Sequence, residues 1–253
     1  MSLMTYTKRR AGAPPGFFEV EAAGLRWLAA AGGVRVATVL EVRPDSLTIE
    51  RVRTDAPTRA AATAFGEALA RTHDAGAPAF GAGPEGWAGD GYIGEAPLSL
   101  RPMESWGAFY ARQRLLPYAG AAHRAGNLSD AELTVVRRLA DRLQAGDFDD
   151  EALPARIHGD LWSGNVLWSP DGVVLIDPAA HGGHRITDLA MLALFGTPQL
   201  AAILAAYDAA GPGLPQDWRR LIPLHQVHPL LVHAHLFGGS YGSQAAAAAQ
   251  RYL

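Results

Sequence analysis

The chain has 253 residues, of which 49% are hydrophobic and 19% charged, and its formal net charge is −3. This is the composition of a globular protein with one large or two small domains, and it gives no electrostatic reason to expect nucleic acid or an anionic membrane as a partner. No apolar run reaches the roughly 20 residues of a spanning helix, and the first residues lack a signal-peptide pattern, so we expect a cytoplasmic protein. The absence of Cys excludes disulfides, thiolate catalysis and Cys-bound metal.

The first residues of the chain predict a small α+β unit. Its expected elements are a strand over residues 5–9, a helix over 17–31 that ends at two glycines, and a hairpin of strands over 34–42 and 46–52. Beyond these strands the apolar residues take up helical spacing. We therefore divide the chain into a domain of residues 1–53 and a domain of residues 54–253.

The second domain is expected to be mainly helical, with a Gly- and Pro-rich surface loop over residues 76–102. Ser129 and Glu132 have the spacing of a capping box, which marks a helix start, and Pro117 predicts a kink. The expected helices cover residues 57–75, 104–124, 129–145, 188–195, 198–210, 217–237 and the alanine run at 245–249.

The segment IHGDLWSGNVLW, residues 157–168, places an acid and an amide on a loop just before a strand. A Ser-Pro-Asp-Gly turn and a second apolar strand follow, so we expect a hairpin. If the hairpin closes at that turn, Asn165 lies opposite Ile176, and Asp177 lies beside Asn165. Asp160 would point into the same space. Two carboxylates and an amide oxygen suit Mg²⁺, which proteins usually hold with one or two oxygens plus substrate phosphates.

The order His158-x-Asp160-x4-Asn165, followed by Asp177, resembles the catalytic and metal-binding segments of the protein-kinase-like fold. The resemblance implies that Asp160 accepts a proton from the attacking hydroxyl. It also implies that Asn165 and Asp177 hold Mg²⁺ ions that bridge the phosphates of ATP. We expect His158 to orient the loop by hydrogen bonding.

The same resemblance implies a nucleotide site in the first domain. Lys8, the only lysine, would contact the phosphates from the third strand of a small lobe and pair with Glu21, with Glu19 as an alternative partner. The alternative for Lys8 and Glu21 is a solvated surface pair, the usual state of such residues. The backbone of the hinge that meets the adenine would belong to Glu50, Arg51 and Val52.

Longer segments narrow the resemblance to one family. They are FFEVEAAGLRWL (17–28), FYARQRLLPY (109–118), HGDLWSGN (158–165) and IDPAAHGGHRITDLAMLALFG (176–196). They are similar to segments of the fructosamine kinase, or ketosamine kinase, family, and Trp162 is the most specific residue. The implied fold is α+β, a protein-kinase-like two-lobe fold with a truncated small N-terminal lobe and a mainly helical C-terminal lobe.

The implied function is an ATP- and Mg²⁺-dependent kinase that phosphorylates a sugar hydroxyl of a small-molecule ketosamine, a fructosamine or ribulosamine adduct. Two alternatives stay open: a kinase of another amino-alcohol, aminoglycoside-like or choline-like, and a non-catalytic kinase-like protein. The second arises because the family carries a glycine-rich hairpin before its lysine strand, and only seven residues precede Lys8. That hairpin gives backbone N–H groups to the phosphates, so we expect weak nucleotide affinity or little activity, whether through a mis-assigned start, a truncation or a decayed enzyme.

Other side chains near the motif have two interpretations each. Trp162, His181 and Arg185 would face substrate or phosphate, although an ion pair that braces the loop is an equal alternative for Arg185. Asp188 is expected to anchor the loop. We interpret four more histidines as structural or pocket residues rather than metal ligands, namely His225, His228, His233 and His235. Three aromatic residues would form a substrate-facing wall or part of the core, namely Trp87, Tyr92 and Trp106.

Overall fold

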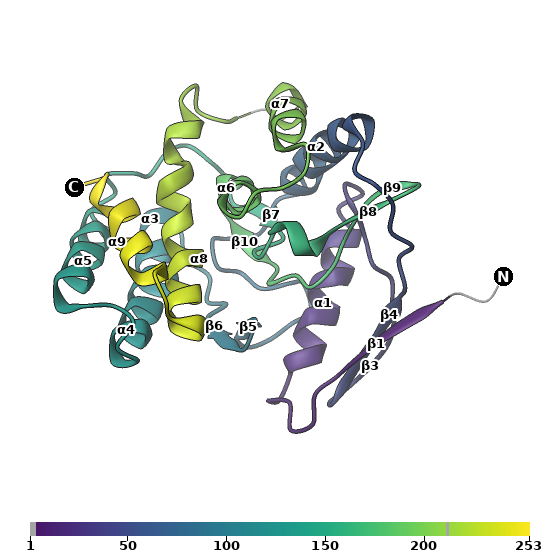
Figure 1. The fold of residues 1–253 in the computed structure, drawn as a ribbon, viewed down its shortest axis with the longest axis horizontal. Helices are drawn as coiled ribbons and strands as arrows, with labels where there is room; N and C mark the ends of the chain where they lie inside the picture. The colour runs from purple at the N-terminus through teal and green to yellow at the C-terminus, as the bar shows by residue number, and fades with distance from the viewer. Residues whose placement is uncertain (1–3, 211–212) are drawn as a thin grey trace.

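The computed structural model of the protein describes residues 4–210 and 213–253. An antiparallel sheet and one helix lie on one side of the molecule, and helices make up the other side (Figure 1). The strands of this sheet have the order β1-β4-β3 and comprise Thr5–Arg9 (β1), Val39–Arg43 (β3) and Ser46–Glu50 (β4). The hairpin of β3 and β4 closes where Arg43 pairs with Ser46, as the Pro-Asp turn between them predicts.

Helix α1 (Phe17–Ala29) forms because its apolar residues recur at helical spacing and bury one face. This face consists of Phe18, Ala22, Leu25 and Leu28, each at most 2% exposed. It packs against the sheet and against the two strands that lie between residues 166 and 175. The helix ends just before Gly32, which has the left-handed backbone that favours glycine. The strand and the helix expected from the sequence are confirmed, and the hairpin forms, but its first strand begins at Val39 rather than at residue 34, because residues 35 and 36 pair in a second sheet.

The second sheet joins the two parts of the chain. Strands β8 (Val166–Ser169) and β9 (Gly172–Leu175) form the expected hairpin, and β2 (Arg35–Val36) pairs parallel with β9. This pairing was not predicted, because a strand of two residues carries no periodic signal. One hydrophobic core extends from α1 through this sheet to the helices beyond it. The division at residue 53 therefore stays a prediction.

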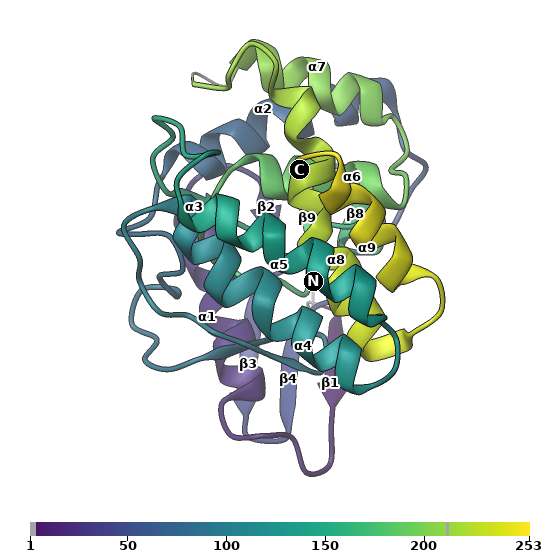
Figure 2. The ribbon, with the colours of Figure 1, turned by 90° about the vertical axis from the view of Figure 1, so that its left-hand side faces the viewer.

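Most of the remaining chain is helical, and no helix among the described residues is long and apolar enough to cross a membrane. Figure 2 shows α4 and α5 in front, the β1-β4-β3 sheet below and α2 and α7 above. The helices are α2 (Arg59–Asp74), α3 (Trp106–Phe109), α4 (Leu116–Arg124), α5 (Asp130–Gln144), α6 (Ile186–Leu194), α7 (Leu200–Ala210), α8 (Ile222–Phe237) and α9 (Tyr241–Gln250).

Two expectations about these helices have definite outcomes. The capping box of Ser129 and Glu132 is formed at the start of α5. Pro117 lies in the first turn of α4, directly after a π-helical segment, Tyr110–Leu115, and does not break the helical run. A proline lacks the N–H that the preceding turn would bond, and a wider turn accommodates this locally.

The stretch over residues 76–102 is not the unstructured loop that its glycines and prolines predicted. It contains a hairpin, β5 (Gly91–Ile93) and β6 (Ala96–Leu98), whose Ile93, Ala96 and Leu98 are buried in the core of the helical side. Strands of three residues, one containing Pro97, give almost no local signal. Their stability comes from packing with residues far along the chain.

A further pair of short strands, β7 (Ala155–Ile157) and β10 (His181–Gly183), lies outside this stretch.

Candidate active site

The catalytic loop runs from the end of β7 to the start of β8, and burial at both ends fixes it. Ile157 and Leu161 are fully buried, whereas Asp160 between them lines a cleft. Gly159 has φ 82°, and a Cβ at this position would collide with the carbonyl of Ala179. Glycine is therefore required between His158 and Asp160.

His158 orients the loop by hydrogen bonding, as expected. Its Nδ1 accepts from the backbone N–H of Asp160 at 3.3 Å, so its Nε2 donates to the carbonyl of Ile176 at 2.9 Å. Burial lowers the pKa of His158, which favours this neutral form. Asp188 anchors the same loop, because its carboxylate accepts the backbone N–H groups of His158 at 2.7 Å and Gly159 at 2.9 Å.

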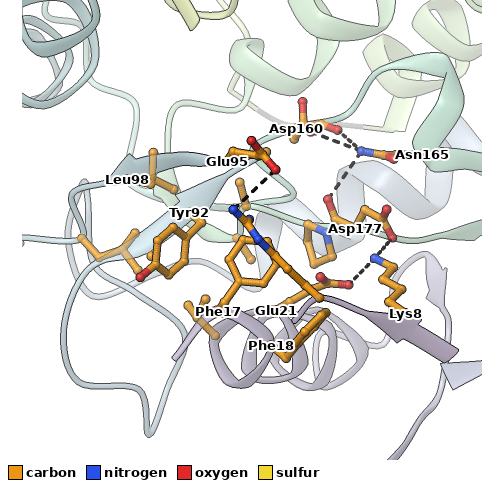
Figure 3. Close-up of a pocket in the computed structure, with 18 of the residues that line it drawn as sticks. Lys8, Phe17, Phe18, Glu21, Tyr92, Glu95, Leu98, Asp160, Asn165 and Asp177 are labelled. Carbon is orange, nitrogen blue, oxygen red and sulfur yellow. Dashed lines mark hydrogen bonds and ion pairs between the residues drawn. The ribbon is translucent and has the colours of Figure 1, made fainter. Parts of the chain in front are cut away.

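The hairpin after the loop brings Asn165 and Asp177 together. Its register pairs Val166 with Leu175, and the N–H of Ile176 donates to the carbonyl of Asn165 at 3.2 Å, as expected. The side-chain nitrogen of Asn165 donates to the backbone carbonyl of Asp160 at 2.7 Å and to that of Asp177 at 3.4 Å. Its amide oxygen therefore stays available as an acceptor beside the carboxylate of Asp177 (Figure 3).

Two features of this arrangement indicate a catalytic site rather than an ordinary turn. Asp177 has φ 56°, a left-handed conformation that is unfavourable for a residue with a side chain and is concentrated at functional sites. Burial raises the pKa of Asp160 to about 7, and the nearby carboxylates of Asp177 and Asp188 add to the shift. A carboxyl group that titrates near neutral pH is suited to accept a proton.

Lys8 on β1 reaches the same place from the sheet. Its Nζ donates to Glu21 Oε1 of α1 at 2.6 Å and also to Asp177 Oδ1 (Figure 3). Burial alone would lower the pKa of Lys8, but the carboxylates of Glu21 and Asp177 outweigh it and raise the pKa. Lys8 and Glu21 are 19% and 14% exposed, so they are a largely buried pair rather than a solvated one, and Glu21 rather than Glu19 is the partner.

Two clefts meet at Lys8 and Asp177, which line both. The first, of about 520 Å³, contains Asp160 and Asn165. The second, of about 320 Å³, contains the expected hinge residues Glu50, Arg51 and Val52, together with apolar Leu167 and Ile176. Glu50 itself is bonded by Arg35 at 2.9 Å.

The described residues contain no group of three or more His, Asp or Glu arranged to hold a metal ion. The oxygens of Asn165 and Asp177 nevertheless match Mg²⁺, which takes only part of its coordination from the protein when phosphates supply the rest. The histidines of α8 fit the structural interpretation, since His225 and His228 are 1% and 3% exposed.

The three residues expected near substrate have different positions. Trp162 lines the first cleft, is 41% exposed, and lies over Gly164, where a Cβ would collide with its ring. His181 is only 3% exposed, with Nδ1 bonded to the carbonyl of Ala179. Arg185 pairs with Asp74 at 2.9 Å, at the end of α2.

His181 and Arg185 line neither of these two clefts, so the expected substrate contact gains no support from them and stays a prediction for both. The chain turns inward after Asp177, so nearness in sequence does not carry these side chains into the cleft. For Arg185 the bracing ion pair, the other alternative, is the one that forms.

Sequence reasoning left several cleft residues unassigned. These are Arg10, Phe17 and Glu95, which line the first cleft. Of the three aromatic residues expected at a substrate-facing wall or in the core, Tyr92 lines the same cleft. Trp106 belongs to the core at 5% exposure, and Trp87 packs against that core. Glu95 was not predicted because the segment that carries it was expected to be a loop, whereas it forms a hairpin of two three-residue strands. The Ile-Gly-Glu-Ala segment, with a glycine at the first position of a two-residue turn, was the available signal.

The choline kinase LicA from Streptococcus pneumoniae shares this fold, with a TM-score of 0.64 at 14% identity over 98% of this chain and 86% of that chain. Such a likeness establishes the fold alone. It defines the class of the fold as protein-kinase-like.

Closer relatives identify the family. A family model described as fructosamine kinase matches residues 6–253. A protein designated a probable ketoamine kinase from Enterococcus faecium is 33% identical over 236 residues, which are 90% of this chain and 80% of that protein. A crystal structure assigned as fructosamine-3-kinase from Thermobifida fusca has a TM-score of 0.90 at 47% identity, over 98% of this chain and 85% of that chain. The chain belongs to the fructosamine kinase family.

Membership makes the protein a kinase of small sugar-amine molecules, a transferase with an alcohol group as acceptor. It also implies the use of ATP, with a divalent metal as is typical of the kinase-like fold.

Proposed function

We propose that the protein transfers the γ-phosphoryl group of ATP to a sugar hydroxyl of a ketosamine, a fructosamine or ribulosamine adduct. The observation that carries the proposal is the meeting of the two clefts at Lys8 and Asp177, with Asp160 facing the first cleft. The ketosamine would bind in the first cleft and the nucleotide in the second. Residues 1–53 would then supply most of the nucleotide site, and residues 54–253 the catalytic loop.

The proposed roles follow from position. Apolar Leu167 and Ile176, with the backbone of Glu50–Val52, would receive the adenine, and the cationic Lys8 would contact the phosphates. Asn165 and Asp177 would hold Mg²⁺, which when bound neutralises charge on the phosphates. Trp162 would contact the sugar from the wall of the first cleft.

Asp160 would act as the base. The acceptor oxygen forms a bond to the γ-phosphorus as the bond to the β–γ bridging oxygen breaks, and ADP leaves with that oxygen. The hydroxyl proton moves to the carboxylate of Asp160. A pKa of about 7 suits this step, because the group is partly deprotonated at neutral pH and basic enough to hold the proton.

A coupled assay that detects ADP tests the proposal. The acceptors are fructosamines and ribulosamines, with an aminoglycoside and choline as competing substrate classes. Turnover of a ketosamine that falls about 10²–10⁴-fold in Asp160→Asn is expected. Asp171→Asn is the matched control, since Asp171 lies in the β8–β9 turn and lines neither cleft. Preferential turnover of choline or the aminoglycoside, or equal rates in both variants, would contradict the proposal.

A further inference from the structure

The β5–β6 hairpin carries one acidic side chain, Glu95, to the mouth of the first cleft. Gly94, with φ 55°, and Glu95 form the two-residue turn between the paired residues Ile93 and Ala96. Ile93 and Ala96 are 5% and 1% exposed, and the hydroxyl of Tyr118 bonds the carbonyl of the next residue, Pro97, at 2.6 Å. The turn is therefore a fixed platform, and the position of Glu95 is set by the core beneath it.

Of the acidic side chains that line this cleft, Glu95 is the one that its neighbours hold most weakly. Glu21 and Asp177 both pair with Lys8, and Asp160 bonds the amide of Asn165. Among the residues that the structure describes, Glu95 pairs with Arg10 alone, at 3.4 Å, and its side chain is 73% exposed (Figure 3). An ion pair as open as this one contributes little to stability, so it exchanges partners at small cost.

The partner of Glu95 shows what this corner of the cleft can bind. The guanidinium of Arg10 lies over the ring of Phe17, 4.8 Å from its centroid, and the ring of Tyr92 is 5.1 Å from that of Phe17. A cation is thus held between an aromatic face and a carboxylate. These are the two elements by which proteins recognise an organic ammonium group.

We infer that Glu95, with the rings of Phe17 and Tyr92, is the subsite for the ammonium nitrogen of the substrate. Arg10 occupies this subsite in the free protein and gives it up when a cationic substrate binds. The inference rests on the proposed function, because it assumes an acceptor that carries a basic amine beside its sugar. Glu95 is then a specificity-determining residue, which separates amine adducts from neutral sugars.

The alternative explanation of the Arg10–Glu95 ion pair is a structural latch with no role in binding. In a latch, Arg10 and Glu95 only tie the segment after β1 to the hairpin, and loss of either partner has the same effect. In an ammonium subsite, Arg10 competes with the ligand and Glu95 binds it. Removal of the two side chains then changes affinity in opposite directions.

Isothermal calorimetry with two matched ligands separates these possibilities. One is a 1-amino-1-deoxyfructose with an alkyl group on its nitrogen, which is cationic; the other is its N-acetylated form, which is neutral. We expect Glu95→Gln to weaken the cationic ligand about tenfold and to leave the neutral ligand unchanged. We expect Arg10→Met to bind the cationic ligand as tightly as the wild type or about two- to fivefold more tightly. In the coupled assay, the Glu95→Gln change should raise KM for the cationic sugar and leave kcat near the wild-type value.

Weaker binding in both variants indicates a latch and overturns the inference. Equal affinity of the wild type and Glu95→Gln for the cationic ligand overturns it as well, and this result leaves the proposed function standing if the wild type still phosphorylates that ligand. A wild-type chain that neither binds nor phosphorylates the cationic ligand overturns both. Because Glu95 is exposed and Arg10 is only half-buried, thermal melts of the two variants should match the wild type and exclude misfolding.

Discussion

Lys8 and Asp177 form an ion pair across 169 residues of sequence, and both side chains line both clefts. Glu21 holds the other side of the Lys8 ammonium at 2.6 Å. The pair therefore fixes the boundary between the two clefts, where a group passing from one ligand to the other would cross. It also links the strand β1 to the residue that follows β9, and so connects the first sheet to the second.

Lys8→Met tests the role of this pair. The substitution removes the cation proposed to contact the phosphates, and charge-assisted bonds of this kind contribute about 1.5–3 kcal/mol, so KM for MgATP should rise about 10–100-fold. Steady-state kinetics with varied ATP measure the change. Arg43→Met is the control, because Arg43 pairs only with Glu41 at the surface and lines neither cleft. An unchanged KM would contradict the assignment of Lys8.

The catalytic loop and the hairpin after it were predictable because their signals are local. One turn of known type fixes the register, and the register alone brings Asn165 beside Asp177. The pairing of Lys8 with Glu21 was predicted from the resemblance to the protein-kinase-like fold rather than from a local signal, and the ion pair forms.

The direction of side chains beyond the hairpin was not predictable. His181 and Arg185 follow Asp177 closely, but β10 pairs with β7 and turns them inward, which is a contact between distant segments. The hairpin that places Glu95 beside Tyr92 was missed for a similar reason, although Tyr92 itself was among the residues expected either at a substrate-facing wall or in the core. Its strands have three residues each and are stable only because Ile93 and Leu98 pack into a core built from helices far along the chain.

Trp162→Ala tests the proposed sugar-facing wall of the first cleft. The indole is 41% exposed and lies on Gly164, so its loss removes a contact surface without leaving a cavity in the core. KM for the ketosamine should rise about tenfold, whereas KM for ATP stays the same. Phe237→Ala is the control, as Phe237 is 70% exposed and lines neither cleft. A rise confined to the KM for ATP would place Trp162 with the nucleotide instead.

Tyr207→Phe tests the buried support of the catalytic loop. The hydroxyl of Tyr207 lies 2.7 Å from Nδ1 of His73, and Nε2 of His73 is 3.2 Å from the carboxylate of Asp188, which anchors the loop. All three side chains are fully buried, so the deleted hydroxyl leaves Nδ1 of His73 without its hydrogen-bond partner. The free energy of unfolding should fall by about 1–3 kcal/mol, measured by urea denaturation. Tyr6→Phe, at a position 55% exposed, should change it by less than about 0.5 kcal/mol.

The stability of the protein should fall as the pH is lowered from about 7.5 to about 5. Burial lowers the pKa of His158, His225 and His228, and it lowers that of His181 to about 3. These groups stay neutral in the folded state, whereas in the unfolded chain they bind protons below about pH 6.5. Their contribution is therefore complete above that pH and is lost as the pH falls toward their folded pKa values. For His181, whose pKa in the folded protein is about 3, the contribution lost at pH 5 is about 2 kcal/mol.

Asp160 acts in the opposite direction. Its pKa is raised to about 7, so the folded state takes up a proton below that pH before the unfolded state does, which adds stability on acidification. Asp160→Asn removes this contribution, and the loss of stability between about pH 7.5 and about pH 5 should be larger in the variant than in the wild type. Urea midpoints at the two pH values measure both slopes. Equal losses in the variant and the wild type would show that Asp160 is ionised in the folded protein across this range and is no proton acceptor near neutral pH.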